Sequence, residues 1–309
     1  MRLLALVLFS ALLSPASGSE GDRNHQHYTC SKACEKSCAA DPGAVELSWD
    51  VRFFGWTCTT NCVHLCTQQH HADRVDQGLP TVKYFGKWPF TRILGMQEIA
   101  SVLFSVGNGL GHVNFLINRH KVPGTYWATD LMVMYAIVGI NTWLWSAVFH
   151  ARDTPHTEKL DYYFALMHTT FSTACALVRV FNVRNNILQC VVMLPFLGLF
   201  VAHVHYMHFT LFDYGWNMKV NVAVYITYVA SWFGWALYTR RPYAWMIVAV
   251  CASMLLVALL EVLDFPPFWG IFDAHALWHA GTIPGLFLFY RFIQKDAEYE
   301  SILDNSKEV

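Results

Sequence analysis

Charge is scarce in this sequence. Asp, Glu, Lys and Arg make up only 14% of its 309 residues, whereas they make up about 25% of a typical soluble domain. Hydrophobic residues account for 55% and aromatic residues for 16%. The formal net charge of −1 gives no basic surface of the kind that binds nucleic acid. Because several apolar runs are longer than the roughly 18 residues that indicate a membrane helix, the composition predicts a protein that crosses a membrane several times.

Three sequence motifs are missing as well. There is no Asn-x-Ser/Thr acceptor, so glycosylation gives no marker for the loops that face a lumen. Ser146 is not part of a Gly-x-Ser-x-Gly turn, which argues against an α/β-hydrolase type of serine enzyme. The glycine-rich stretch Gly107–His112 lacks the preceding strand and the following lysine of a phosphate loop. We interpret its glycines as small residues that let membrane helices pack closely.

The N-terminus is typical of a signal peptide. Arg2 is followed by the apolar run Leu3–Leu13 and then by the small residues of Pro15–Gly18. This pattern predicts a cleaved signal over residues 1–18. The apolar run is too short for a helix to cross about 30 Å of hydrocarbon, which argues against the alternative of a retained anchor.

Six of the nine cysteines lie close together in two triplets, each with a spacing of four residues. Such a triplet lines one face of a helix, and two antiparallel helices would bring both triplets together. Sequence alone permits fifteen pairings. The antiparallel arrangement favours a nested set of disulfides: Cys30–Cys66, Cys34–Cys62 and Cys38–Cys58. A zinc cluster is the alternative, and an oxidising lumen favours the disulfides.

The apolar segments predict an all-α polytopic membrane protein: a seven-transmembrane helix bundle with an N-terminal disulfide-rich helical luminal domain. We expect this luminal domain over residues 19–92, the seven-span domain over 93–294 and a cytosolic tail over 295–309. The predicted spans lie near residues 94–117, 126–149, 160–181, 187–207, 219–239, 243–263 and 274–293.

The distribution of charge predicts the orientation of these spans. A cleaved signal leaves the N-terminus in the lumen, so that alternate loops and the tail face the cytosol. Those cytosolic positions hold eight basic residues: Arg119, Lys121, Arg179, Arg184, Arg240, Arg241, Arg291 and Lys295. The luminal loops between spans hold three: Arg152, Lys159 and Lys219. This asymmetry obeys the positive-inside rule.

In this topology the ends of three spans deliver polar residues to the luminal face. Ser146 and His150 end the second span, Asp161 begins the third, and His275 and His279 begin the seventh. Residues four apart share a helix face, so the last two imidazoles could bind one ion. Three imidazoles with one open position predict a catalytic Zn²⁺. Asp161 would orient or deprotonate the water, and Ser146 would stabilise an oxyanion.

Each of these residues also has a simpler explanation when taken alone. His150 could be an interfacial histidine with its tip in water. Asp161 could be a carboxylate favoured in the first turn of a helix. Ser146 could bond the backbone carbonyl one turn back. Asp273 is more readily interpreted as the N-cap of the last helix than as a catalytic group. The convergence of several such residues on one side favours the joint interpretation.

The order and spacing of these five candidate residues resemble those of the CREST superfamily of seven-span metal hydrolases. The cysteine-rich segment and the stretch Trp143–Asp153 are similar to one branch of it, the Per-like family, which remodels GPI anchors. The resemblance implies a Golgi enzyme, or one also found in the endoplasmic reticulum. It would remove the unsaturated sn-2 fatty acid from the phosphatidylinositol of GPI-anchored proteins. His150, His275 and His279 would bind zinc, with Ser146 and Asp161 catalytic.

Two other functions remain compatible with the sequence. A ceramidase-like lipid amide hydrolase would use the same metal–water chemistry, although the disulfide-rich extension argues against it. A non-catalytic seven-span lipid receptor or chaperone would use zinc only for its structure. A transporter would require charged residues at mid-membrane and broken helices, and the sequence has no clear example of either.

Overall fold

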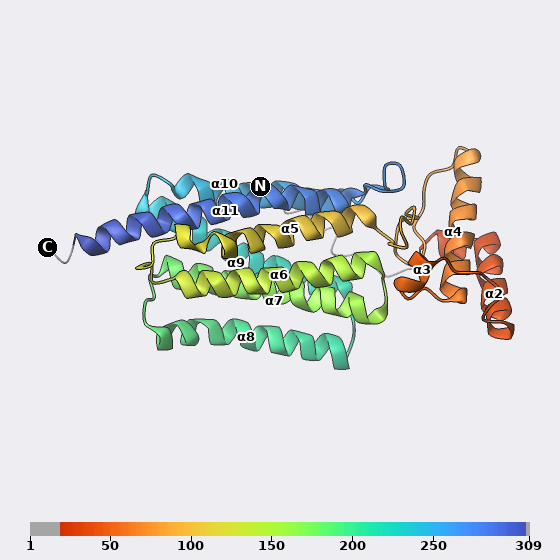
Figure 1. Cartoon of the computed structure of the whole chain (residues 1–309), viewed down its shortest axis with the longest axis horizontal. Coiled ribbons are helices and arrows are strands. Elements are labelled where there is room, and N and C mark those ends of the chain that lie inside the picture. Colours follow the sequence, from red (N-terminus) through yellow and green to blue (C-terminus); the bar gives the residue numbers. More distant parts are fainter. Residues whose placement is uncertain (1–18, 307–309) are drawn as a thin grey trace. The chain divides into compact units, whose positions relative to one another are not determined.

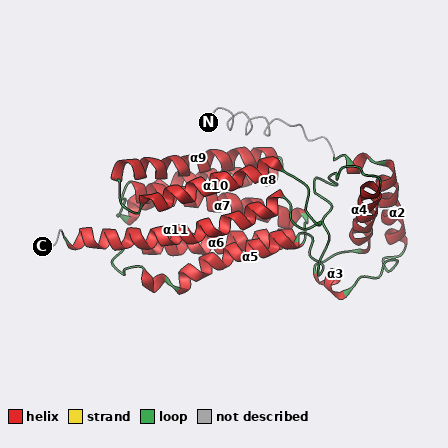
Figure 2. Cartoon of the chain, turned by 90° about the horizontal axis from the view of Figure 1, so that it is seen from above, coloured by secondary structure: helices red, strands yellow, loops and turns green. Residues whose placement is uncertain are grey.

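The computed structural model describes residues 19–306, and within this range the chain is helical without any named strand. The predicted signal peptide at residues 1–18 lies outside the described residues. Figure 2 shows helices joined by loops throughout the described part. The helices are η1 (Gly21–Arg23), α2 (His25–Ala40), α3 (Trp49–Phe53), α4 (Cys58–Asp76), α5 (Ile99–Ile117), η2 (Arg119–Lys121), α6 (Thr129–Ala151), α7 (Pro155–Val180), α8 (Asn186–Phe209), α9 (Tyr214–Thr239), α10 (Ala244–Leu263) and α11 (Ala274–Asn305).

The chain forms two compact units. Of the described residues, the first comprises 19–103 with the segments His150–Thr154 and Leu260–Leu277. The second comprises Phe104–Phe149, Pro155–Leu259 and 278–306. In the second unit, the long helices lie side by side (Figure 1), and α7 packs against both α8 and α9. The division of the sequence into a luminal domain, a seven-span domain and a tail stays a prediction.

In the first unit, α2 and α4 lie side by side and are each capped at their N-terminus. Asn24 Oδ1 accepts hydrogen bonds from two backbone N–H groups of α2, at 2.9 and 3.3 Å. Thr57 and Thr60 form a reciprocal capping box at the start of α4. Three disulfides then join the two helices, in the nested pairing that the spacing predicts: Cys30–Cys66, Cys34–Cys62 and Cys38–Cys58.

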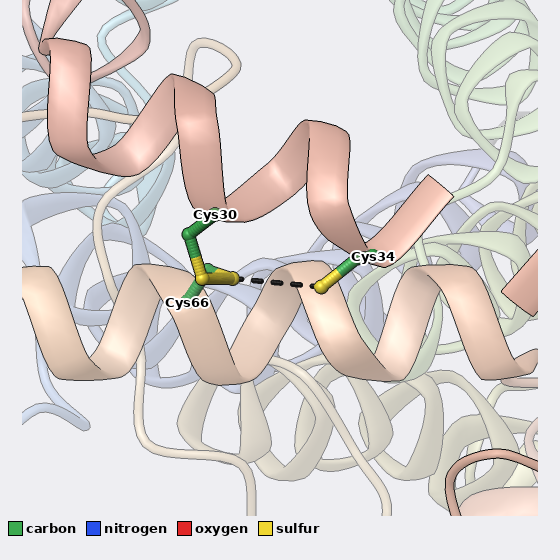
Figure 3. Close-up of side chains that lie close together, drawn as sticks. All are labelled: Cys30, Cys34 and Cys66. Atoms are coloured by element: carbon green, nitrogen blue, oxygen red, sulfur yellow. Dashed lines mark hydrogen bonds between the residues drawn. A yellow bond between two sulfur atoms is a disulfide. The ribbon is translucent and has the colours of Figure 1, made fainter. Parts of the chain in front are cut away.

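The same pairing excludes the alternative of a zinc cluster at these cysteines. Figure 3 shows Cys30 bonded to Cys66, with Cys34 beside them. The sulfurs of Cys34 and Cys66 are 3.5 Å apart. Both of these sulfurs belong to disulfides and carry no proton, so the contact is a van der Waals contact. A metal requires a thiolate, and none of these three residues can supply one while oxidised.

Five helices of the described chain are long and apolar enough to cross a membrane: α5, α6, α8, α9 and α10. Helices α7 and α11 occupy the positions predicted for the third and seventh spans, but they fall outside this group. Both helices carry polar residues within their apolar segments, such as His168 in α7 and His279 in α11, and these lower the mean hydropathy. The prediction of multiple membrane helices is confirmed, and the count of seven stays a prediction.

The glycine-rich stretch of α5 allows close helix packing, as expected. A Cβ at Gly107 would lie 2.8 Å from Ile283, and one at Gly111 would lie 2.6 Å from Leu286, both on α11. A Cβ at Gly139 on α6 would clash with the ring of His112. Small residues at these positions therefore let α5 approach both α6 and α11.

A buried ion network joins helices at one end of the second unit. Arg179 of α7 donates to both carboxylate oxygens of Asp296, at 2.5 and 2.6 Å, and to Glu300 at 2.9 Å. The side chain of Asp296 is fully buried and also accepts hydrogen bonds from the Tyr126 and Tyr243 hydroxyls, each at 2.7 Å. These contacts explain why α11 continues through its charged segment.

We expect Asp296→Ala to lower the free energy of unfolding by about 3–5 kcal/mol, because it leaves the Arg179 guanidinium buried without its main partner. Glu298→Ala, which removes an exposed ion pair with Lys295 on the same helix, should cost no more than about 1 kcal/mol. Denaturant unfolding of both variants in detergent, followed by tryptophan fluorescence, checks the difference. Equal losses would contradict the assigned role of the network.

Candidate metal centre

His150, at the end of α6, is held by Glu98 in two ways. The backbone N–H of Glu98 donates to the backbone carbonyl of His150 at 3.0 Å. The side chain of the same glutamate places Oε2 2.6 Å from His150 Nδ1. Both side chains are buried, with 2% and 5% of their surface exposed. One residue therefore fixes the last turn of α6 and the orientation of the imidazole.

Glu98 is itself held by charge. Lys87 Nζ lies 2.6 Å from Glu98 Oε1 and 3.1 Å from Asp153 Oδ2. Burial disfavours the ionised form of Glu98, but the charge of Lys87, followed by His150, outweighs burial and holds the pKa of Glu98 well below its ordinary value. Burial likewise disfavours the charge on Lys87, but Glu98 and Asp153 raise its pKa. The carboxylate is therefore ionised and accepts the Nδ1 proton of His150.

His275 has a matching arrangement on α11. Its Nδ1 lies 2.5 Å from Glu261 Oε1, near the end of α10. Asp273 caps α11 by accepting a hydrogen bond from the backbone N–H of Ala276 at 2.8 Å. The sequence-based assignment of Asp273 as an N-cap is therefore confirmed, and the cap fixes the helix turn that carries His275.

The two imidazoles face each other through their other nitrogens. His150 Nε2 lies 3.3 Å from His275 Nε2. When each Nδ1 donates its proton to a carboxylate, a ring in its neutral form carries a lone pair on Nε2. Two lone pairs at this distance repel unless a positive charge lies between them. A metal ion would supply that charge, and an additional proton is the simpler alternative.

The spacing fits zinc. Two nitrogens bound tetrahedrally at about 2.0–2.1 Å from one Zn²⁺ lie about 3.3 Å apart, as these do. Metal-bound histidines commonly donate their second N–H to a carboxylate. His279 lies one turn after His275 on the unbroken helix α11. With His150 these residues make a group of three imidazoles that could hold a metal ion.

His279 also lies beside two serines in the second unit. Ser105 Oγ is 3.5 Å from His279 Nδ1 and 3.1 Å from Ser146 Oγ. Asn108 Nδ2 donates to the backbone carbonyl of His279 at 2.9 Å. Ser146 and His279 are 4% and 2% exposed. The predicted oxyanion donor, Ser146, is therefore buried, and its hydroxyl lies within hydrogen-bond distance of the Ser105 hydroxyl.

Asp161 lies on α7 in the second unit and is half-buried. Because α7 begins at Pro155, Asp161 falls in the second turn rather than the first. The stabilising effect of a helix N-terminus on a carboxylate is largely confined to the first turn. The simpler explanation of this residue is therefore weakened, and its catalytic role stays a prediction.

Three residues of the site were not predicted from the sequence. Ser105 lies in an apolar segment where a serine carries no distinctive signal. Glu98 and Glu261 did carry one, because both lie inside predicted spans, where an acidic residue is costly and marks a functional position. Their contacts with His150 and His275 depend on tertiary structure.

The sequence matches one protein family and several named proteins. Residues 48–297 match the model of the Per1-like family. "Protein PER1 homolog" of Schizosaccharomyces pombe is 37% identical, over 95% of this chain and 92% of its own. "Post-GPI attachment to proteins factor 3" of Drosophila melanogaster is 36% identical, over 94% and 92%. "GPI-specific phospholipase A2-like PGAP3" of Bos taurus is 36% identical, over 96% and 95%. No solved structure matches the chain.

Proposed function

Because this chain belongs to the Per1-like family, we propose that it is a zinc-dependent phospholipase A2-type hydrolase that acts on GPI-anchored proteins. It would remove the unsaturated sn-2 fatty acid from their phosphatidylinositol during GPI fatty-acid remodelling. The printed names of relatives from Drosophila melanogaster and Bos taurus support a role in GPI remodelling. The metal chemistry rests on the residues of this chain.

The observation that carries the proposal is the pair of facing imidazoles. His150 Nε2 and His275 Nε2 lie 3.3 Å apart, while the opposite nitrogen of each ring lies against a carboxylate. Two carboxylates, that of Glu98 buried and that of Glu261 partly exposed, are positioned to fix the tautomers of the two histidines, which is typical of a metal centre. With His279 as third ligand, one position is left for water or substrate, as in catalytic zinc sites.

The bound zinc would supply a Lewis acid and lower the pKa of a water molecule to about 7. Asp161 would accept the proton of the water that attacks the sn-2 ester carbonyl, and would pass it to the departing glycerol oxygen. The Ser146 hydroxyl would donate a hydrogen bond to the developing oxyanion. Ser105, 3.1 Å from Ser146, would hold that hydroxyl in position.

The proposed location follows from the substrate. GPI-anchored proteins and their glycans lie on the luminal side of the membrane, and the sn-2 ester lies just below the head groups. We therefore place the site at the luminal surface of the Golgi, or also of the endoplasmic reticulum. The N-terminus would be luminal and the C-terminus cytosolic, as the charge asymmetry between loops supports.

The direct test is hydrolysis by the purified protein of a GPI-anchored reporter that carries a labelled unsaturated chain at sn-2. Mass spectrometry should detect the free fatty acid and the corresponding lyso-lipid. A ceramide offered in parallel should remain intact. Release of fatty acid from ceramide, with the GPI lipid unchanged, would instead support the ceramidase alternative.

A first prediction concerns Glu98. We expect Glu98→Ala to weaken zinc binding by about 10–100-fold, because it removes the carboxylate that orients His150. Glu98→Gln keeps an oxygen that can accept the Nδ1 proton, and should retain more of the affinity. Competition with a fluorescent chelator measures both constants. Wild-type affinity in Glu98→Ala would exclude an orienting role.

A second prediction concerns topology. A tag fused after Val309 should be cleaved by protease added to the outside of sealed microsomes, because the C-terminus is expected in the cytosol. The cysteine-rich segment, detected with an antibody to residues 19–92, should be protected until detergent is added. A protected C-terminal tag would overturn the proposed orientation.

A further inference from the structure

A groove of about 180 Å³, with a mostly apolar lining and a few polar groups, lies between α2 and α4, within the first unit. One water molecule needs only about 10–15 Å³ of such space, so the groove has room for a group of several non-hydrogen atoms. None of its lining residues belongs to the metal centre. The lining consists of Gln26, His27, Cys30, Cys66, Gln69, His70 and Asp73.

His27 lines the groove but is almost fully buried, and its hydrogen bonds define the tautomer of its ring. Thr67 Oγ1 donates its one proton to the Val63 carbonyl at 3.1 Å, so the same oxygen must accept the bond of 3.0 Å from His27 Nε2. The proton of this ring is therefore on Nε2, and Nδ1 is an acceptor. Burial, followed by the neighbouring His70, lowers the pKa of His27, which keeps the ring neutral.

His70 contributes a second neutral imidazole. Its Nδ1 bonds the Tyr84 hydroxyl at 2.6 Å, and burial, followed by Arg74, lowers its pKa. The centroids of the His27 and His70 rings are 6.0 Å apart. In the described part of the chain, neither His27 nor His70 belongs to a group of three or more side chains that could hold a metal ion. The groove is therefore not built for a metal ion.

The remaining lining groups define the class of ligand. Gln26 and Gln69 are amides that can both donate and accept. Asp73 accepts a hydrogen bond of 2.8 Å from Gln69 Nε2 and is the one carboxylate among the lining residues. No lysine or arginine is among the lining residues, so the groove offers no countercharge to an anion such as phosphate. Sugar hydroxyls, which donate and accept in turn, match this set of planar polar groups.

An aromatic side chain lies beside these polar groups. Phe85 is 66% exposed, and its ring centroid lies 5.7 Å from that of His27. An exposed aromatic ring next to convergent hydrogen-bonding groups offers an apolar surface for the C–H face of a sugar ring, and most ligand sites combine an apolar surface with a few placed polar groups.

We propose that this groove binds one hexose of the glycan that links a GPI lipid to its protein. The proposal deepens the proposed function and rests on it for the identity of the natural ligand. The disulfide-linked pair α2–α4 would then select lipids that carry a glycan. Free phosphatidylinositol, which has the same ester but no hexose, would not use the groove.

Saturation-transfer NMR on the full-length protein in detergent tests the groove directly, with methyl α-mannopyranoside as the probe. Gln26→Trp fills the groove from an exposed position in the first turn of α2, and Ser37→Trp places the same side chain on an exposed position of α2 outside the lining. Wild type and Ser37→Trp should saturate the sugar, and Gln26→Trp should reduce the signal at least tenfold. No transfer in wild type, or equal transfer in Gln26→Trp, would overturn the proposal.

A second measurement separates this proposal from the proposed function. In hydrolysis of a GPI lipid, Gln26→Trp should raise KM about tenfold and leave kcat unchanged, while hydrolysis of phosphatidylinositol should not change. An unchanged KM for the GPI lipid would overturn the groove's role in substrate binding. If the wild-type protein hydrolyses neither lipid, the proposed function fails. The saturation-transfer experiment still decides whether the groove binds a hexose.

Discussion

His275→Ala should abolish GPI-anchor remodelling in cells while the protein remains expressed at its normal level. The substitution removes one of two facing imidazoles, and with it a ligand of the proposed zinc. A metal that supplies several kcal/mol of transition-state stabilisation corresponds to a rate loss of about a thousandfold or more. Mass spectrometry of the fatty acids on a GPI-anchored reporter should therefore find the unsaturated sn-2 chain retained.

The matched control for this variant is His205→Ala. His205 is an exposed histidine on α8, so its loss removes an imidazole from the chain without touching the candidate site. Remodelling should continue at the wild-type rate in this control. Normal saturated chains on the reporter in cells that carry only His275→Ala would refute the assignment of that residue as an essential ligand.

Asp161→Ala should lower the rate of ester hydrolysis by about 10²–10⁴-fold, the usual contribution of a general base, while both zinc content and folding are retained. The combination separates a catalytic metal from a structural one. If the protein were a receptor or chaperone with structural zinc, no hydrolysis would depend on Asp161. Zinc content, thermal unfolding and hydrolysis are to be measured on the same purified sample.

Asp130→Ala is the appropriate control for Asp161→Ala. Asp130 is an exposed carboxylate in the first turn of α6, which is the kind of position that would explain Asp161 without any catalysis. Loss of Asp130 should cost no more than about 1 kcal/mol of stability and leave hydrolysis intact. If Asp161→Ala behaved in the same way, its assignment as a catalytic residue would be withdrawn.

The elements that the sequence predicted best are those set by local spacing. The four-residue spacing of the cysteines determines which helix faces must meet, and the disulfides follow that pattern. The apolar run at 243–263 forms α10, Ala244–Leu263. In both cases the determining signal lies within one or two turns of helix.

The predictions that failed at helix boundaries depended on distant partners or on turns. The first apolar segment was expected from residue 94, but α5 begins at Ile99 because a turn with positive φ at Leu94 and Gly95 precedes it. The last was expected to end at residue 293, but α11 continues to Asn305. Its charged residue Asp296 is stabilised by Arg179 of α7, a contact that periodicity does not reveal.

The residues of the candidate site likewise fall into those that local spacing predicts and those that depend on distant contacts. The four-residue spacing of His275 and His279 is a local signal that the two imidazoles could reach one ion, and the prediction of zinc also required His150 from another span. The carboxylates beside His150 and His275 come from other segments of the chain. The backbone N–H of Glu98 also donates a hydrogen bond to the backbone carbonyl of His150, where two helix ends meet. Carboxylates that orient a histidine in this way have no fixed spacing from it in the sequence.

Removal of the metal from the purified active protein decides whether hydrolysis depends on zinc. We expect one zinc per chain, loss of GPI-lipid hydrolysis when a chelator removes it, and recovery on addition of one equivalent of Zn²⁺. A protein that hydrolyses the lipid at its full rate with no bound metal would show that zinc takes no part in the reaction.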